Sequence, residues 1–377
     1  MTIAPQLVNN GVQFVTGDLL PAAAQNATIS NASIAAIEVT SAMTRPTCWI
    51  ETCTPVVVNE TVVAVTRSIV NSGSDQLFIG ISGDVIRNVS VSSPSWFGAI
   101  LFNQTEAKWY AFSSTYGTAW YKSSSTTMAE MNAASGFEFP EQISVAAAAF
   151  TSSSSTDVLV CGSTIGDDGK IVKLTSTSST VAYSSPGNPL SDIATSPSGG
   201  YGVAVSSSHI AYSSNSGSTW TAATYPSIPA HLGHLMVTWS ELAGGCFIVS
   251  GVTATGQLFW STSTTGSSWQ AWKKTQQVAV PPTANSYLLN CGMCAIGSTT
   301  LVAPYVTKQA YGSDIVGALV SIDSGASWTT IAGTGSFPYC TRIRAMKLGN
   351  RAIIVSKNGF TATPAILVDS PLAAVSA

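Results

Sequence analysis

Hydrophobic residues in most of the chain occur in short runs that are separated by clusters of Gly, Ser, Thr, Asn and Asp. Three such runs are Asp157 to Cys161, Gly245 to Val252 and Arg351 to Val355. Short hydrophobic runs bounded by turn-forming residues are typical of β-strands. No long segment carries hydrophobic residues at the spacing of an amphipathic helix. The pattern therefore predicts an all-β protein.

A short motif recurs through the middle of the chain. Each copy ends in Trp, has Gly three positions earlier and, where it is complete, begins with Ser followed two positions later by Asn or Asp. The copies contain Ser213, Asn215, Gly217 and Trp220; Ser321, Asp323, Gly325 and Trp328; Gly266 and Trp269; and Ser113, Gly117 and Trp120. The last two copies carry Thr264 and Thr115 at the position of Asn or Asp.

Each residue type in this motif suits a β-hairpin. The Asn or Asp side chain accepts hydrogen bonds from backbone N–H groups of its own turn, and Gly permits the positive φ of a tight turn. The Trp then covers the hairpin and packs between adjacent sheets. We expect all four glycines, Gly117 included, to lie in hairpin turns. The two hairpins with Thr should be looser, because a hydroxyl makes a weaker turn.

The spacing of the motif predicts a repeated structural unit. The interval from Trp120 to Trp220 is about twice that from Trp220 to Trp269, which corresponds to a unit of roughly 50 residues. A further unit is expected near residues 165 to 180, where Gly166 to Gly169 marks a turn that no Trp follows. That unit has lost its motif.

The motif resembles the Asp-box of sialidase-like and other BNR-type repeat proteins. The resemblance implies a β-propeller whose boxes lie on the outer rim and serve the structure. The candidate blades span residues 45–92, 95–137, 142–187, 190–227, 232–279, 284–335 and 338–370. This division predicts about seven four-stranded blades, or six if the first unit is not a blade.

Residues 1–44 differ from the propeller expected at 45–377. They carry only two charged side chains and an Ala-, Asn-, Ser- and Thr-rich stretch from Ala22 to Ala42. Such a segment has too few large hydrophobic residues to form a core of its own. We expect an extended N-terminal arm that docks on a neighbouring subunit. The alternative is that its last part pairs with the final blade.

The resemblance does not extend to the catalytic groups of a sialidase, and we predict no catalytic residue. The family needs three converging arginines and an early Arg-Ile-Pro motif. This chain has only six arginines in total, and Pro46 follows Arg45 without the intervening Ile. Arg342 and Arg344 would share one face of a strand, and a solvated face is favoured over an anion clamp. No phosphate-binding loop, nucleophile elbow or dinucleotide motif is present. We expect no cofactor, and an enzyme is the less favoured alternative.

Two other groups of residues suggest metal or acid chemistry but have simpler interpretations. Cys291 and Cys294 form a CxxC in a predicted strand, where positions three apart point to opposite faces. His231 and His234 have no third ligand nearby in the sequence. We therefore predict no metal site. The adjacent acids at 167 and 168 are expected to be turn formers rather than a paired catalytic site.

Charge and hydropathy exclude several partners. Only 9% of residues are charged, the net charge is −3 and no Lys/Arg run occurs, so nothing would neutralise a row of phosphates. No apolar run is long enough to span a membrane. The first basic residue is Arg45, so a secretory signal is not expected and synthesis in a host cytoplasm is the simplest expectation.

Two functions remain open from the sequence. The favoured one is a non-enzymatic structural or adhesion component of a virion, such as a bacteriophage fibre, tail or capsid-associated protein, with other virion proteins contacted through the arm. A host surface glycan is a further candidate partner. The alternative is a carbohydrate-binding or carbohydrate-active propeller. Its sugar-stacking side chains would be aromatic residues outside the boxes. The candidates are Trp109, Tyr110, Trp260 and Trp272.

Overall fold

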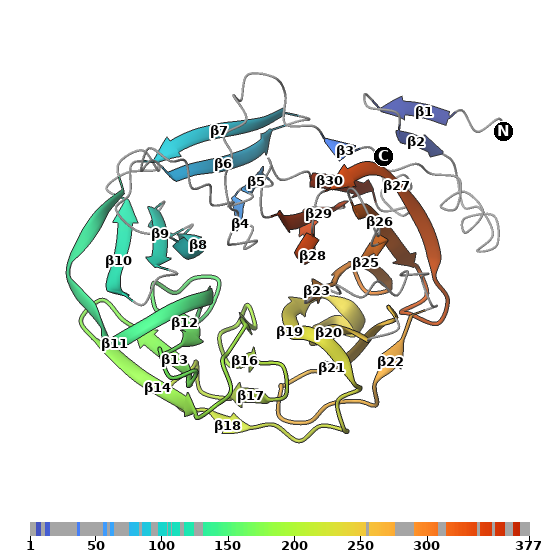
Figure 1. Ribbon diagram of the computed structural model, residues 1–377. Helices are drawn as coiled ribbons and strands as arrows, with labels where there is room; N and C mark the ends of the chain where they lie inside the picture. Colours follow the sequence, from blue (N-terminus) through green and yellow to red (C-terminus); the bar gives the residue numbers. More distant parts are fainter. Residues whose placement is uncertain are drawn as a thin grey trace.

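The computed structural model is a ring of small β-sheets (Figure 1). It describes residues 5–8, 12–15, 36–37, 56–58, 61–63, 75–82, 85–91, 97–103, 105–106, 108–113, 117–123, 131–253, 256–275, 290–307, 314–337, 340–348, 351–358 and 365–369. Within these ranges, every regular element is a strand except the 3-10 turn Leu242–Gly244. The predicted all-β class is confirmed.

Three sheets consist of four consecutive antiparallel strands each. The first contains β15 (Asp192–Thr195), β16 (Gly202–Val205), β17 (Ile210–Ser213) and β18 (Thr221–Ala222). The second contains β19 (His231–Ser240), β20 (Cys246–Thr253), β21 (Leu258–Ser263) and β22 (Lys273–Lys274). The third contains β24 (Cys294–Ile296), β25 (Thr300–Thr307), β26 (Asp314–Ser321) and β27 (Thr329–Phe337). Each fits one of the units that the sequence predicts and extends beyond it by no more than two residues.

A seven-stranded sheet precedes these three. Its strands are β8 (Phe97–Asn103), β9 (Lys108–Ser113), β10 (Gly117–Ser123), β11 (Met131–Phe150), β12 (Val158–Ser163), β13 (Gly169–Leu174) and β14 (Ser179–Ser185). The first part of β11 pairs with β10 and its second part pairs with β12. The boundary expected at residues 138–141 therefore falls inside one continuous strand, whose pairing changes from β10 to β12 between Ile143 and Ser144. Buried Phe139 and Ile143 carry the strand through this segment without a turn.

The last sheet joins the two ends of the chain. It contains β28 (Cys340–Leu348), β29 (Arg351–Asn358) and β30 (Ala365–Asp369), with β3 (Ala36–Ile37) antiparallel to β30 and β23 (Asn290–Gly292) parallel to β28. For Ala36 and Ile37 the structure therefore has the alternative arrangement, in which the arm supplies a strand to the final blade.

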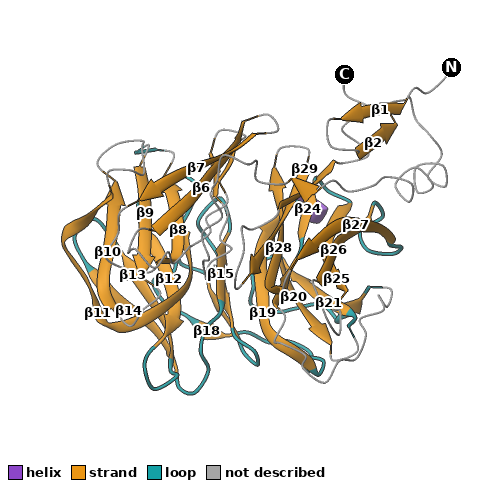
Figure 2. Ribbon diagram, turned by 45° about the horizontal axis from the view of Figure 1, so that its top comes forward, coloured by secondary structure: helices purple, strands orange, loops and turns teal. Residues whose placement is uncertain are grey.

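Three hairpins complete the described strands. They are β1 (Pro5–Val8) with β2 (Val12–Val15), β4 (Val56–Val58) with β5 (Thr61–Val63), and β6 (Asp75–Ser82) with β7 (Val85–Val91). The β1–β2 hairpin lies outside the ring in both Figure 1 and Figure 2. Because residues 56–91 form two separate hairpins, the count of seven blades stays a prediction, as does the boundary at residue 44.

The core lies between neighbouring sheets rather than on one side of each. All eight residues of β20 and all four of β16 are buried. Val203 and Val205 of β16 pack in one cluster with Phe247 and Val249 of β20. Strands covered on both faces are expected to be continuously hydrophobic rather than alternating, and this explains the unbroken apolar runs in the sequence.

Candidate functional site

The hairpin between β17 and β18 shows how the repeated motif folds. Gly217 has φ 76° and donates its N–H to the Ser213 hydroxyl at 2.9 Å. The Asn215 side-chain oxygen accepts the N–H of Thr219 at 2.9 Å. The Trp220 indole N–H donates to the Gly217 carbonyl at 3.1 Å, and the ring is buried. The motif residues therefore satisfy one another within a single turn.

The hairpin between β26 and β27 repeats this arrangement. Gly325 has φ 87° and donates to the Ser321 hydroxyl at 2.8 Å, and Asp323 accepts the N–H of Ser327 at 2.9 Å. Burial tends to raise the pKa of Asp323, but hydrogen bonds from Ser327 and Ser321 outweigh it and lower that pKa. Trp328 is half-buried and packs against the core cluster that includes Trp260 and Leu301.

The hairpin between β21 and β22 differs from the predicted alignment. Gly266, with φ 81°, donates its N–H to Ser263 at 2.9 Å, which is three rather than four positions earlier. Ser263 therefore anchors this turn, which is one residue shorter, and Thr264 does not stand at the position of Asn or Asp. Trp269 is buried and donates to the Gly266 carbonyl at 2.9 Å, as in the longer hairpin.

The fourth copy is not a hairpin at its glycine. Gly117 is the first residue of β10 and pairs with Ile143 of β11, so the prediction that it lies in a turn is wrong. Pairing to β11 requires extended backbone at this position. Ser113 ends β9, and Trp120 pairs with Phe112 in the same sheet. Residues 114–116 and the side chain of Trp120 lie outside the described part.

Each of the three hairpin glycines approaches the preceding sheet closely. A Cβ atom would come within 2.4 Å of a side-chain atom there, and the contacts are Gly217 with Leu159, Gly266 with Val203, and Gly325 with Trp260. Real Cβ atoms are not found at such separations, so the absence of a side chain is required as well as the positive φ. These hairpins hold neighbouring sheets together.

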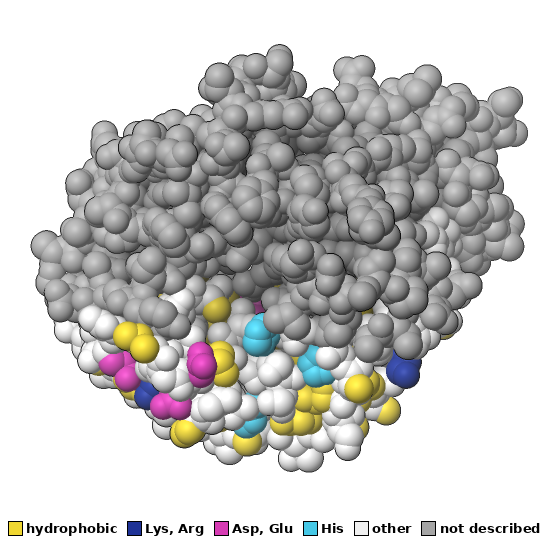
Figure 3. Space-filling model, viewed as in Figure 1, with side chains coloured by type: hydrophobic (Ala, Val, Ile, Leu, Met, Phe, Trp, Pro, Cys, Tyr) yellow, Lys and Arg dark blue, Asp and Glu magenta, His cyan; other side chains and the backbone are white. Residues whose placement is uncertain are grey.

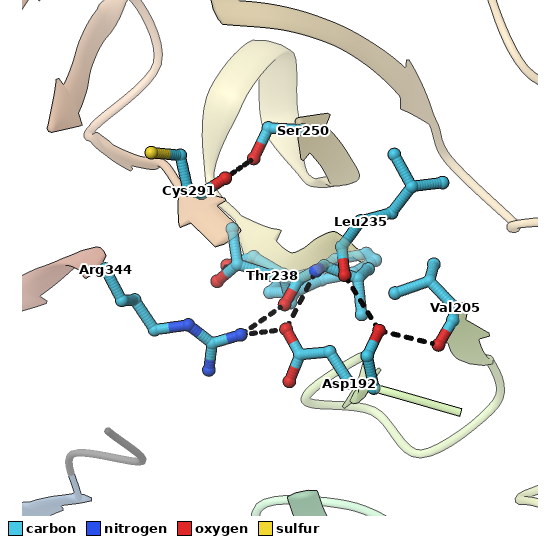
Figure 4. Close-up of polar contacts among 10 residues, drawn as sticks. Asp192, Val205, Leu235, Thr238, Ser250, Cys291 and Arg344 are labelled. Carbon is cyan, nitrogen blue, oxygen red and sulfur yellow. Dashed lines mark hydrogen bonds and ion pairs between the residues drawn. The ribbon is translucent and has the colours of Figure 1, made fainter. Parts of the chain in front are cut away.

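A buried ion pair links strands that are far apart in the sequence (Figure 4). Asp192, the first residue of β15, has no exposed surface and pairs with the Arg344 guanidinium of β28. The same carboxylate accepts the N–H of Val237 in β19 at 2.9 Å, and Arg344 donates to the Val237 carbonyl at 3.2 Å. The expectation that Arg344 lies on a solvated face is wrong, because this carboxylate draws it inside.

This ion pair belongs to the framework rather than to a ligand site. It joins three strands from three different sheets, and the buried carboxylate is already neutralised by Arg344. Nearby, the buried Ser191 hydroxyl contacts the carbonyls of Val205 at 3.1 Å and Leu235 at 2.9 Å. These side chains supply the hydrogen bonds that the buried backbone groups would otherwise make with water.

One end of the sheets carries a group of loops that we call the loop face. It comprises residues 164–168, 186–191, 206–209 and 223–230, which connect β12 to β13, β14 to β15, β16 to β17 and β18 to β19. Successive antiparallel strands place alternate connections at the same end. These loops therefore form one continuous part of the surface.

Tyr183 of β14 meets His209, which belongs to the loop 206–209 of the loop face. The Tyr183 hydroxyl lies 2.7 Å from His209 Nε2, and the two rings are parallel within 1° with centroids 6.2 Å apart. The turn that presents His209 is fixed by the buried Ser206 hydroxyl, which accepts the N–H groups of Ser208 at 3.2 Å and His209 at 3.0 Å. These two hydrogen bonds fix the position of the His209 ring beside Tyr183.

Both rings are uncharged at neutral pH. Burial lowers the pKa of His209 below its ordinary value of 6.5. Burial also raises the pKa of Tyr183 above 10.0, with a smaller opposing effect from a hydrogen bond to Ser185. Neither side chain is fully covered, because each is half-buried.

Polar groups from neighbouring loops lie around this pair. Ser208 donates to the Asn188 side-chain oxygen at 3.0 Å, and Tyr225 donates to the Ser208 carbonyl at 3.2 Å. Asp168 accepts the N–H of Gly187 at 3.0 Å, and Asp167 has φ 61°, as turn residues do. On the face of the ring in Figure 3, the described surface is mostly white and yellow, with histidine side chains and scattered acidic and basic side chains visible.

The aromatic residues that the sequence proposed as sugar platforms are placed differently. Trp260 and Tyr110 are buried, so a stacking role is wrong for both and packing explains them. Trp272 is half-buried, donates to the Pro226 carbonyl at 3.0 Å and packs edge-on against Phe259. The side chain of Trp109 lies outside the described part.

The candidate metal ligands are held by other contacts. Cys291 and Cys294 are buried, and burial raises the pKa of Cys294 to about 12. The His231 ring has Nδ1 2.7 Å from the Pro229 carbonyl. Among the described residues, no group of three or more His, Cys, Asp and Glu side chains could hold a metal ion. Within the same ranges, no helix has the length and apolar character needed to cross a membrane.

Sequence reasoning did not identify Asp192, Tyr183 or His209. Each is an isolated residue without a local motif, and its partner comes from another segment. Only Arg344 carried a signal, as one of few arginines in a chain with little charge.

Comparison with known proteins reveals the fold but no close relative. No protein-family model and no curated protein matches the chain. An ancestral GH74 enzyme is similar over 85% of this chain, with 14% identity and a TM-score of 0.57, and the chain spans 48% of that enzyme's length. YCF48 bound to D1 peptide matches over 86% of this chain and 93% of its own, with 11% identity and a TM-score of 0.52. The RRP9 WD40 repeats match over 89% and 97%, with 7% identity and a TM-score of 0.57. These likenesses and the four-stranded sheets show that the chain has the β-propeller fold.

Proposed function

We propose that this chain is a non-enzymatic structural or adhesion component of a virion, with a propeller of the Asp-box type and a loop face that contacts a partner. The Ser213, Asn215, Gly217 and Trp220 contacts support the Asp-box assignment, as do their counterparts between β26 and β27. In this proposal the boxes stabilise the scaffold and bind nothing.

The observation that carries the proposal is the character of the loop face. Around Tyr183 and His209 it presents aromatic rings, hydroxyls and an amide, with the Asp168 carboxylate bonded to the neighbouring Gly187 N–H. Aromatic rings flanked by a few hydroxyl and amide groups are typical of a binding surface. The buried carboxylate Asp192 serves the framework instead. Solved propellers of similar fold include both a GH74 enzyme and a peptide-bound protein, so the fold itself is neutral on this point.

The arm supplies the second part of the proposal. The β1–β2 hairpin stands outside the ring (Figure 2), where other virion proteins could bind it. Very low charge suits a protein that functions inside an assembly, because a surface with few charges resists association weakly.

Mass spectrometry of the native assembly tests this function. Particles from producing cells are purified on a density gradient, washed in high salt and digested. We expect the chain at a fixed ratio to capsid or tail proteins. Deleting residues 1–30, which leaves β3 in place, should give a soluble propeller of near-native thermal stability that is missing from the particles. A chain found only free in solution contradicts the proposal, and a truncated chain that still assembles contradicts the role of the arm.

The alternative is a carbohydrate-active propeller, and the purified chain distinguishes it. Incubation with neutral and anionic polysaccharides, followed by analysis of reducing ends, should show no cleavage. Release of sugar would overturn the non-enzymatic assignment.

A further inference from the structure

The Tyr183 and His209 rings are parallel and lie side by side rather than one over the other. The phenol oxygen lies in the plane of the tyrosine ring, and Nε2 lies in the plane of the imidazole ring. Because the two planes are parallel, they can be no farther apart than these two atoms, which is 2.7 Å. With centroids 6.2 Å apart, the rings must then lie side by side. We call this pair the aromatic plate.

The aromatic plate is preorganised. Tyr183 comes from β14 and packs against a core cluster that contains Leu159, Ile171 and Trp220. His209 sits on a turn that the buried Ser206 hydroxyl fixes through two backbone N–H groups. A surface that is already ordered loses little conformational entropy when a ligand binds.

Hydrogen-bonding groups lie around His209. The Ser208 hydroxyl and the Asn188 amide, bonded to each other at 3.0 Å, come from two different loops, and the Tyr225 hydroxyl reaches the Ser208 carbonyl. Ser208 and Asn188 retain unused donor and acceptor positions after these bonds, because a hydroxyl and an amide each make several. Both residues are partly or largely exposed.

We propose that the aromatic plate, with Asn188, Ser208 and Tyr225, binds an uncharged saccharide. This inference rests on the proposed adhesion function and names the chemistry of its partner. A flat aromatic surface complements the C–H face of a sugar ring, and a few placed hydroxyls and amides fix its orientation.

Nearby charges favour a neutral sugar over an acidic one. Asp168 accepts the N–H of Gly187, next to Asn188, and would repel a carboxylate or sulfate on the ligand. Lys170 is already paired with Glu141 at 3.3 Å and bonded to the Ser184 hydroxyl at 3.1 Å. The site therefore offers an acidic saccharide no free cation among these neighbours.

Binding of the full-length chain to an array of neutral, sialylated and sulfated saccharides tests the inference. Calorimetry then measures its affinity for the neutral saccharide that binds most strongly. We expect neutral saccharides to bind and sialylated and sulfated saccharides not to bind. His209→Ala should weaken binding about tenfold by removing half of the plate, and Tyr183→Phe about threefold by releasing the ring from Nε2. Tyr201→Phe, in the loop between β15 and β16 at the opposite end of its sheet, is the matched control and should bind normally.

Several outcomes would overturn the saccharide site. They are binding of acidic saccharides alone, neutral binding that His209→Ala leaves intact, or a partner that proves to be a protein with no saccharide bound. Thermal melting of each variant shows whether it is folded. If Tyr183→Phe does not fold, binding by His209→Ala alone decides the test. The virion role is judged separately, because particles carrying His209→Ala should retain the chain at its normal ratio.

Discussion

The carboxylate of Asp192 and the guanidinium of Arg344 lie 152 positions apart in the sequence and form a buried ion pair. Both bond to the backbone of Val237, so β15, β19 and β28 meet at one point. Burying charges is unfavourable unless each finds its partner, so the strands are held in this arrangement by the cost of separating them.

Removing the cation alone should be strongly destabilising. Arg344→Met leaves the Asp192 charge buried, and we expect a loss of roughly 3–5 kcal/mol in the free energy of unfolding, measured with urea. Adding Asp192→Asn, which keeps an acceptor for the Val237 N–H without the charge, should recover much of that loss.

Lys347→Met is the matched control on the same strand. Lys347 pairs with Glu241 at 2.6 Å, but the two side chains are 37% and 59% exposed. Its loss should cost less than about 1 kcal/mol. If Arg344→Met were equally mild, the ion pair would not hold these strands together.

The glycine of each hairpin should tolerate no side chain. Gly217→Ala adds a Cβ at positive φ and within 2.4 Å of Leu159, and we expect a loss of roughly 2–5 kcal/mol. Gly187→Ala is the control, because Gly187 has φ 66° and nothing within 4 Å of the added atom. It should lose only about 1–2 kcal/mol. Equal losses would mean that contact with the preceding sheet is unimportant.

Truncating the tryptophan of a hairpin should destabilise the fold without affecting binding. Trp220→Ala removes a buried ring and its hydrogen bond to Gly217, at a cost of roughly 3–5 kcal/mol. Trp328→Ala should cost less, because that ring is half-buried. Partner binding should survive in the folded fraction. Lost binding at an unchanged melting temperature would make these residues part of a site.

The aromatic plate should make stability depend on pH at both extremes. The pKa of His209 is lowered in the fold, so the unfolded chain binds more protons and stability falls as pH drops below about 6.5. The pKa of Tyr183 is raised, so stability also falls as pH rises above about 10. Melting temperatures of the wild type and His209→Gln across pH 4 to 8 measure the acid arm. The variant should lose less stability on acidification, and an identical profile would contradict this assignment.

The hairpins were predictable because their contacts are local. Ser213, Asn215, Gly217 and Trp220 bond within one turn, so their spacing in the sequence carries the geometry. Gly117 shows the limit of this reasoning. It shares the spacing, but pairing with Ile143 places it in a strand.

The contacts between sheets could not be predicted in this way. Asp192 meets Arg344 only because two distant sheets converge, and no local pattern encodes that meeting. Tyr183 and His209 lie 26 positions apart, on a strand and on a turn of the next sheet. Their approach depends on how adjacent sheets are stacked, which periodicity does not specify. The sequence likewise does not show that the boundary expected at 138–141 falls inside one continuous strand, β11.

Electron microscopy of the native particle is the most direct measurement of where this propeller acts. The density should show a ring at the particle surface, with the N-terminal arm toward the other virion proteins and the loop face, marked by the turn of His209, directed outward. Density with the loop face covered by another virion protein, or a particle that lacks the ring, would contradict an adhesion role.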